Sequence, residues 1–420
     1  SCKIYVISEW EKGIRSKHMR SKRQHIGPGA MIAAAFIGPG TVTTATLAGG
    51  NFGFTLLWAI AFSVLATLIL QEMTARLGVV GKRGLGEAIA QKTRGRLLYW
   101  PMTLLVIAAV FIGNAAYEAG NITGAIIGLP RWYLGDVNLW AVGIGFIAFM
   151  VLSTGRTPLI ERVLVLLVAG MAAVFLCTAI ITQPSIAGIA SGLLTPSIPE
   201  NAAMLVVGLI GTTVVPYNLF LHASAVKNHA ISGMTLKEAR QDIALSVVGG
   251  GLITLCIVIT AAASLHGTGK PITSISQIAP TLEPLMGAAA AAVLTVGLFA
   301  AGLSSAITAP LAAAYAVTEI LALNEQRREQ VFRWTWLLVL GVGVLFASFS
   351  LKPLQLILFA QIANGLLLPV CAAFILWIAN DRSMLQRHTN TGLQNLSGVF
   401  VIAITLILGA RSLSLAAGWL

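Results

Sequence analysis

The chain has 420 residues, of which 57% are hydrophobic and 10% charged, and its formal net charge is +12. A water-soluble domain carries about a quarter charged residues, so this composition excludes a soluble core. Charge-free apolar stretches long enough to cross about 30 Å of hydrocarbon recur along the chain, whereas the strands of a membrane barrel alternate with period two. The sequence therefore predicts an all-α integral membrane protein in a lipid bilayer.

The first predicted element is a tail of residues 1–25, which is basic and has no continuous apolar core. That pattern is typical of a cytoplasmic segment and not of a cleaved signal peptide. Beyond the tail, apolar runs between polar breaks predict about eleven membrane-spanning helices. In chain order they cover residues 26–49, 53–76, 98–128, 137–154, 158–182, 201–225, 242–264, 285–321, 333–350, 353–379 and 396–417.

Basic residues lie in alternate loops between these helices. With the N-terminus in the cytoplasm, all basic residues fall in cytoplasmic segments except Arg131, Lys270, Lys352 and Arg411. The positive-inside rule supports the helix count, because one helix miscounted in the middle would reverse every later loop. A bacterial inner (plasma) membrane is the expected location, with the basic loops facing an anionic leaflet. A nucleic-acid partner is not expected, because the charge is divided among short loops.

Glycine and proline clusters interrupt two of the predicted spans at mid-depth. The first span carries the sequence Gly38-Pro39-Gly40-Thr41, and the sixth carries GTTVVP at residues 211–216. Backbone groups inside a membrane need hydrogen-bond partners, so such breaks normally line a cavity or pack against protein. One interpretation is that both breaks form a substrate site. The other is that each merely kinks a packed helix.

The breaks lie in corresponding positions of two sets of five helices. This order predicts two five-helix repeats, residues 26–182 and 201–379, with an additional helix at 396–417. If the repeats are inverted in the membrane, half-helix ends and freed carbonyls meet near the midplane. The matching order favours the substrate-site interpretation over simple kinks.

One acidic residue lies deep in a predicted span. Glu118 is in the third helix, with Asn114 four residues before it and Asn121 three residues after it, so the three share one face. An ionisable group inside a membrane is costly and is a functional candidate by default. The alternative is a protonated carboxyl group that hydrogen-bonds a neighbouring helix.

Other polar residues of the spans allow two interpretations each. His222 follows the second break and could relay protons, although a lone helical histidine is more often structural. Gln361 and Asn364 share a face of the tenth helix and fit either the pathway or helix packing. Glu72 lies four residues before Arg76, which predicts an intrahelical ion pair.

Several segments resemble the NRAMP (natural resistance-associated macrophage protein) family of proton-coupled divalent-metal transporters. They include GPGAMIAAAFIGPG, GGNFGFTLLW, LILQEMTARLGVV, VVGLIGTTVVPYNLFLHAS, LFAAGLSSAITAPLA and QIANGLLLPV, and the likeness runs over nearly the whole chain after residue 26. The resemblance implies the leucine-transporter fold, with a 5+5 inverted repeat, broken helices 1 and 6, and alternating access.

The metal ligands of the family do not carry over. Its first helix has Asp-Pro-Gly-Asn, where this chain has Gly38, Pro39, Gly40 and Thr41. Its sixth helix has Met-Pro-His, where this chain has Val-Pro-Tyr at residues 215–217. The carboxylate, the amide and the thioether that would hold a transition metal are all absent, so the metal ligands are unknown.

Other positions match the family. Glu118 stands at an acidic position of the family's proton route, whereas Asn121 replaces a second acid. His222 matches a family histidine, and Gln361 matches the glutamine that approaches the metal. The resemblance therefore implies only part of the usual proton pathway, through Glu118, Asn121 and His222.

The sequence thus predicts a secondary transporter, neither an enzyme nor a protein with a cofactor. The expected substrate-binding residues are Gly38, Pro39, Thr41, Thr212, Val215, Tyr217, Gln361 and Asn364. The cargo would be a divalent cation, with Mg²⁺ favoured over Mn²⁺ and Fe²⁺ because the methionine is missing. The alternative is a non-metal solute such as an amino acid, an organic acid or another anion, held by helix N-termini.

Overall fold

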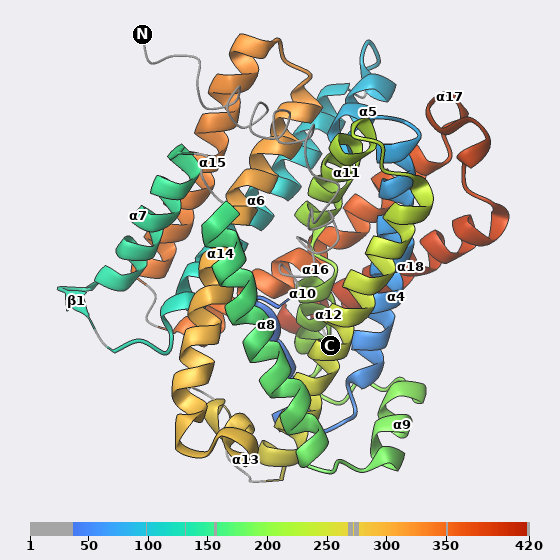
Figure 1. The fold of residues 1–420 in the computed structure, drawn as a ribbon. Coiled ribbons are helices and arrows are strands. Elements are labelled where there is room, and N and C mark those ends of the chain that lie inside the picture. Colours follow the sequence, from blue (N-terminus) through green and yellow to red (C-terminus); the bar gives the residue numbers. More distant parts are fainter. Residues whose placement is uncertain are drawn as a thin grey trace.

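The computed structural model describes residues 37–97, 99–130, 132–154, 158–267, 272, 277–349 and 352–417, with the side chains of 158–162 and 416 excepted. The predicted N-terminal tail and the start of the first predicted span lie outside the described residues. The described chain is a bundle of long helices, with a small antiparallel hairpin at one edge (Figure 1).

The first half of the bundle contains six helices and the hairpin. Its elements are α3 (Pro39–Phe52), α4 (Leu57–Val79), α5 (Leu85–Thr93), α6 (Tyr99–Ile126), β1 (Tyr133–Leu134), β2 (Val137–Asn138), α7 (Leu139–Thr154) and α8 (Pro158–Ile181). The long helices match the predicted spans to within a few residues. The sequence did not predict α5, a short helix between the second and third spans.

The second half begins with another short helix that the sequence did not predict, α9. Its elements are α9 (Ile186–Leu194), α10 (Ala203–Thr213), α11 (Pro216–Ile231), α12 (Leu236–Leu265), η2 (Ala279–Leu282), α13 (Glu283–Met286), η3 (Gly287–Ala289), α14 (Ala290–Leu321), α15 (Glu325–Ser348), α16 (Pro353–Ala379), α17 (Arg382–Leu385), η4 (Gln386–His388) and α18 (Gly392–Ala416). The span predicted at 285–321 begins with short turns, because Pro280 and Gly287 interrupt regular hydrogen bonding before α14.

Nine helical stretches of the described residues are long and apolar enough to cross a membrane, with α10 and α11 counted as one. The helix α7 is apolar but shorter, and α3 is the described part of the first predicted span. A helix therefore lies in each of the eleven predicted spans. These observations confirm an all-α membrane protein.

Basic residues gather at one end of the bundle, here called the basic end: the segments 80–98, 227–240, 322–333 and 380–391. It is at the top of Figure 1, where α5 and α17 lie, and α9 and α13 lie at the opposite end. Side chains at the basic end cap the N-termini of several helices. Thr235 and Glu238 form a capping box at α12, and Thr391 and Gln394 form another at α18.

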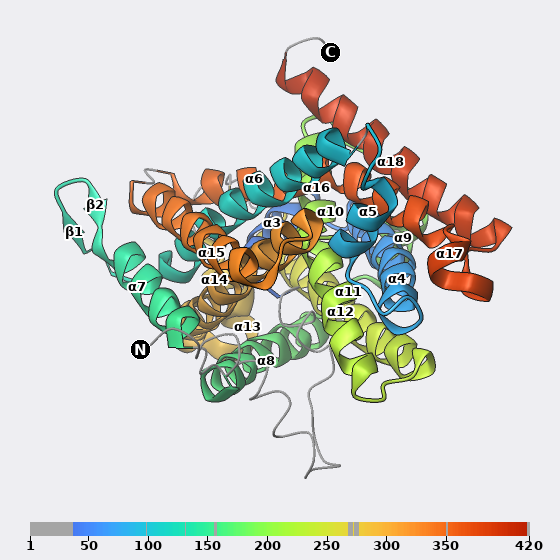
Figure 2. The same ribbon diagram turned by 90° about the horizontal axis from the view of Figure 1, so that it is seen from above.

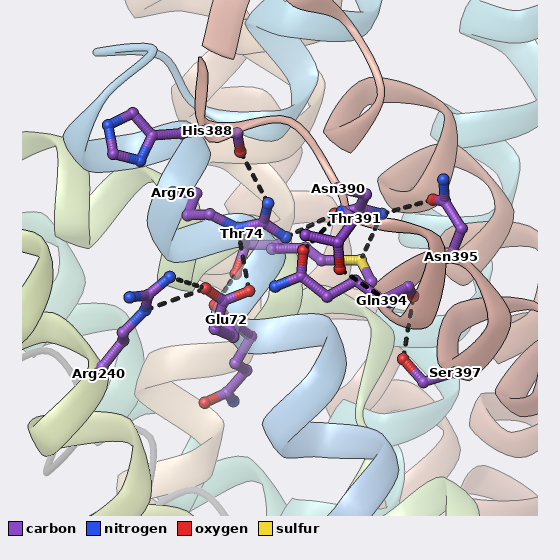
Figure 3. A network of polar contacts seen from close by, with 12 residues as sticks. Glu72, Thr74, Arg76, Arg240, His388, Asn390, Thr391, Gln394, Asn395 and Ser397 are labelled. Carbon is purple, nitrogen blue, oxygen red and sulfur yellow. Dashed lines mark hydrogen bonds and ion pairs between the residues drawn. The ribbon is translucent and has the colours of Figure 1, made fainter. Parts of the chain in front are cut away.

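An ion-pair network at the basic end ties three parts of the chain together. Arg76 Nε donates to Glu72 Oε2 at 3.0 Å, which confirms the predicted intrahelical pair, and Arg240 of α12 binds the other oxygen of Glu72 at 2.7 Å. Arg76 also donates to the carbonyl of His388 at 2.7 Å and to Asn390 Oδ1 (Figure 3). Arg76 is only 2% exposed, and its guanidinium joins α4 to the segment before α18, while Arg240 joins α12 to the same network through Glu72.

Replacing Arg76 with methionine should lower the free energy of unfolding by about 3 kcal/mol, because it leaves three partly buried acceptors without their buried charged partner. The unfolding midpoint of the purified protein in detergent measures this loss. The control is Arg333→Met, which removes an exposed pair with Glu329 at 3.8 Å and should cost less than about 1 kcal/mol. Equal midpoints for both variants would contradict the proposed stabilising role.

Candidate functional site

The sixth span is broken where the sequence predicted. The helix α10 ends at Thr213 and α11 begins at Pro216, so Val214 and Val215 connect them outside either helix. Val215 is extended, with φ −79° and ψ 121°, and Val214 is non-helical, with φ −99° and ψ 74°. Proline has no N–H to continue the ladder, and its fixed φ suits the first turn of a new helix.

The first span has a matching feature. The helix α3 starts at Pro39, and Gly38 precedes it in an extended conformation, with φ −83° and ψ 170°. Neither α3 nor α11 has a side-chain cap at its N-terminus, and neither has an acidic residue in its first turn. Among the described residues, therefore, no side-chain cap and no first-turn acid offsets the partial positive charge of these two N-termini.

The two breaks meet. Thr41 Oγ1 of α3 and Thr212 Oγ1 of α10 lie 2.8 Å apart, and both side chains are buried. One hydroxyl donates to the other across 171 positions of the sequence. This contact brings together one predicted substrate residue from each half of the chain.

Two close contacts lie beside this location. The Gln361 amide of α16 packs so tightly against Gly40 that a Cβ at Gly40 would overlap it. On the other side, Gly124 of α6 gives room to Pro39 in the same way. The Gln361 Oε1 atom is buried and has no hydrogen-bond partner among the described residues. The amide oxygen is therefore available to bind a ligand beside the two threonines.

Not all the predicted residues point to this location. Tyr217 stacks edge-to-face on Tyr117 of α6, with ring centroids 5.3 Å apart, and Val215 belongs to the same small apolar cluster. Asn364 lies one turn further along α16, where its Oδ1 approaches Gly113 of α6. The site thus has a hydroxyl and amide part beside an aromatic part.

Glu118 is fully buried in α6. Its Oε2 lies 3.5 Å from the amide of Asn121, and its aliphatic carbons pack on Gly343 of α15. The Oε1 atom has no hydrogen-bond partner among the described residues. Glu118 directly follows Tyr117, one of the two rings of the aromatic pair, on α6.

His222 belongs to α11, and its side chain contacts α4. Its Nδ1 is 2.8 Å from Thr74 Oγ1, and its Nε2 has no partner among the described residues. The amide atoms of Asn218, one turn earlier on α11, and Gln71 Oε1 on α4 are also buried without a described partner. A polar layer therefore runs between these two helices on the side of the second break nearer the basic end.

Sequence reasoning missed several residues of this region. Tyr117, Gln71 and Asn218 are polar groups in apolar helices, a signal that was available. The sequence also did not indicate that Glu319, at the end of α14, is buried with its carboxylate receiving a hydrogen bond from Ser224 of α11. A position at a helix end normally predicts exposure, but here α5 and α11 cover it.

The described residues contain no group of three or more His, Cys, Asp or Glu side chains placed to hold a metal ion. The site offers neutral oxygens from Thr41, Thr212 and Gln361. Such oxygens bind hard, hydrated cations or polar solutes better than they bind soft transition metals.

A sequence model of the family described as Natural resistance-associated macrophage protein-like matches residues 29–415. The chain belongs to the NRAMP family. It is 31% identical over 296 residues to the divalent metal cation transporter MntH of Yersinia pestis (strain Pestoides F), which covers 68% of this chain and 70% of the relative. The NRAMP membership predicted from the sequence segments is confirmed.

Solved structures support the fold. A crystal structure of the Eremococcus coleocola manganese transporter matches 92% of this chain and 85% of its own, with a TM-score of 0.68 at 23% identity. Mhp1, a nucleobase-cation-symport-1 family transporter, matches 94% of both chains with a TM-score of 0.52 at 16% identity. These likenesses confirm the leucine-transporter fold, with its 5+5 inverted repeat and broken helices.

Gly40→Ala tests whether the close contact with Gln361 holds the site together. The added Cβ displaces the amide, so transport should fall by about ten- to a hundredfold, the usual cost of moving a positioned group by 1 Å. Uptake of the cargo into proteoliposomes measures this loss of transport. The control is Gly143→Ala on α7, where a Cβ meets open space, and which should retain full activity. Full activity in Gly40→Ala would remove Gln361 from the site.

Proposed function

We propose that this chain is a secondary active transporter that moves a divalent cation by alternating access. The observation that carries the proposal is the contact of Thr41 with Thr212, which joins two broken helices into one buried polar site. The N-terminus and the basic end would be cytoplasmic, in accordance with the positive-inside rule. A bacterial inner membrane is the proposed location.

The proposed cargo is a hard ion such as Mg²⁺, and Mn²⁺ or Fe²⁺ fit less well. Val215 stands where the family has a sulfur ligand, and its side chain joins the apolar cluster around Tyr217. The remaining donors are neutral oxygens, which cannot replace the full hydration shell of a divalent ion. Mg²⁺ loses water reluctantly and is usually bound with several waters, so outer-sphere contacts suit it.

Proton coupling is the second part of the proposal. Glu118, a buried carboxyl group beside the aromatic edge of the site, would carry the proton in symport with the cation. Asn121 would orient it through the amide contact at 3.5 Å. His222 would continue the route toward the basic end through the polar layer of Gln71 and Asn218.

A second candidate is a non-metal solute with an anionic group, such as an amino acid or an organic acid. The observation that favours it is the pair of uncapped N-termini, at Pro39 and Pro216, with no acid in either first turn. Helix N-termini bind carboxylates and other anions through free N–H groups. Tyr217 and Val215 would then contact the apolar part of the solute.

Removing the hydroxyls of Thr41 and Thr212 tests whether these residues bind a ligand or only hold the two helices together. In the variant Thr41→Val/Thr212→Val, saturable binding of Mg²⁺ should weaken by about tenfold or more, because each lost donor or acceptor in a buried site costs about 1–3 kcal/mol. Isothermal titration with Mg²⁺, Mn²⁺, an amino acid mixture and organic acids measures it. Thr405→Val on α18, which removes only bonds to the carbonyls of Val401 and Ile402 in the same helix, is the control. Heats with a carboxylate solute and none with any metal would support the second candidate instead.

Glu118→Gln tests whether Glu118 carries the coupled proton. The amide keeps the shape of the side chain but carries no titratable proton, so uptake should lose its dependence on external pH and fall by about tenfold or more. Initial rates in proteoliposomes between about pH 5.5 and 7.5 give the comparison. Glu329→Gln, on the exposed start of α15, should keep the wild-type profile. An unchanged pH profile in Glu118→Gln would exclude this residue from the mechanism.

A further inference from the structure

An apolar groove runs along the outer face of α16, away from the substrate site. It encloses about 450 Å³ between α6, α16 and α18, and α18 lies along the outside of α16 (Figure 2). Its lining is almost entirely apolar and includes Met102, Leu105, Ala373, Trp377, Ile402 and Leu406. Ala373 is exposed at its floor, between the buried Ala372 and Phe374, so the small side chain produces the depression.

The groove lies in the half of the bundle next to the basic end. On α16 it extends from Trp377, two residues before the helix ends at Ala379, to Pro369. At 1.5 Å per residue this is about 12 Å, close to the half-thickness of a hydrocarbon core. On α6 it begins at Met102, one turn after the helix starts. These positions fit one leaflet of a bilayer.

Charged residues surround the end of the groove where Trp377 lies. Lys92 Nζ of α5 is 4.3 Å from the centre of the Trp377 ring, 3.2 Å from its carbonyl oxygen and 2.9 Å from Asp381 Oδ2. These contacts bring the end of α5 and the start of α17 to this point. Lys92 and Asp381 balance one another, while Arg94 and Arg96, which follow Lys92, are exposed basic residues.

We propose that this groove binds an acyl chain of a phospholipid whose headgroup is anionic, in the leaflet at the basic end. The apolar lining fits the chain, and its span matches one leaflet. The indole of Trp377 stands at the depth where tryptophans anchor membrane proteins. The exposed Arg96 and Arg382, four residues after Lys92 and one after Asp381, complement a phosphate headgroup, since a basic residue near an anionic surface contributes favourably. The proposal is independent of the cargo and rests only on the orientation proposed above.

Filling the groove tests the acyl-chain part of the proposal. Purified protein in detergent is titrated with phosphatidylglycerol or with phosphatidylcholine of the same chain length, and lipid adducts are counted by native mass spectrometry. Phosphatidylglycerol should bind the wild type about tenfold tighter than the Ala373→Phe variant, whose ring occupies the floor. Ala169→Phe, a matched exposed alanine on α8, should bind like the wild type. Retained binding in Ala373→Phe would overturn the site.

The headgroup is tested separately in Arg96→Gln/Arg382→Gln. This variant should lose the preference for phosphatidylglycerol over phosphatidylcholine, while Arg327→Gln, an exposed arginine at the start of α15, should keep it. No preference in the wild type would overturn the charge argument. The same spectra report the mass of the protein: a dimer that Ala373→Phe dissociates and lipid does not affect would mean that the groove holds a second copy, which also overturns the proposal. Neither lipid-binding experiment measures transport of the cargo, so their results are independent of those on the substrate site.

Discussion

The constraint on which this structure depends is the need of each backbone polar group inside a membrane for a hydrogen-bond partner. A continuous helix satisfies these groups with its own hydrogen bonds. A broken helix leaves some of them without a partner in the same helix. Here the breaks are placed against each other, so that Thr41 and Thr212 bond across the contact and the freed backbone lies inside protein. The same requirement that makes the breaks costly therefore fixes where they occur and creates the polar site between them.

Close packing of glycine holds this arrangement in place. Gly211 of α10 and Gly365 of α16 bring the two backbones so near that a Cβ on either would overlap main-chain atoms. Lipid provides no hydrophobic force between helices, so small residues and tight contacts must supply the attraction. Gln361 lies on α16, the helix that makes these contacts with α10. The position of its amide beside Gly40 therefore follows from the backbone packing of α16.

Much of the fold was predictable because its signals are local. Apolar length fixed the spans, and the GPGT and GTTVVP segments located the breaks to within a residue or two. The alternation of basic loops predicted one basic end, and ion pairs join the described segments 80–97, 227–240 and 380–391 there, while the tail and residues 155–157 lie outside the described residues. The short helices α5 and α9 were missed because neither has the length of a span, and α9 has no charged residue to mark an amphipathic face.

The site was only partly predictable, because its geometry depends on which helices pack together. Thr41 and Thr212 were expected to converge and do so, but the partnership of Tyr217 with Tyr117 depends on a contact between α11 and α6. That partnership bears on the cargo, because Tyr217 packs on Tyr117 in an apolar cluster and adds no charge to the neutral oxygens of Thr41, Thr212 and Gln361. An ion held by neutral oxygens keeps much of its hydration shell, which favours a hydrated cation or a solute over a bare metal ion.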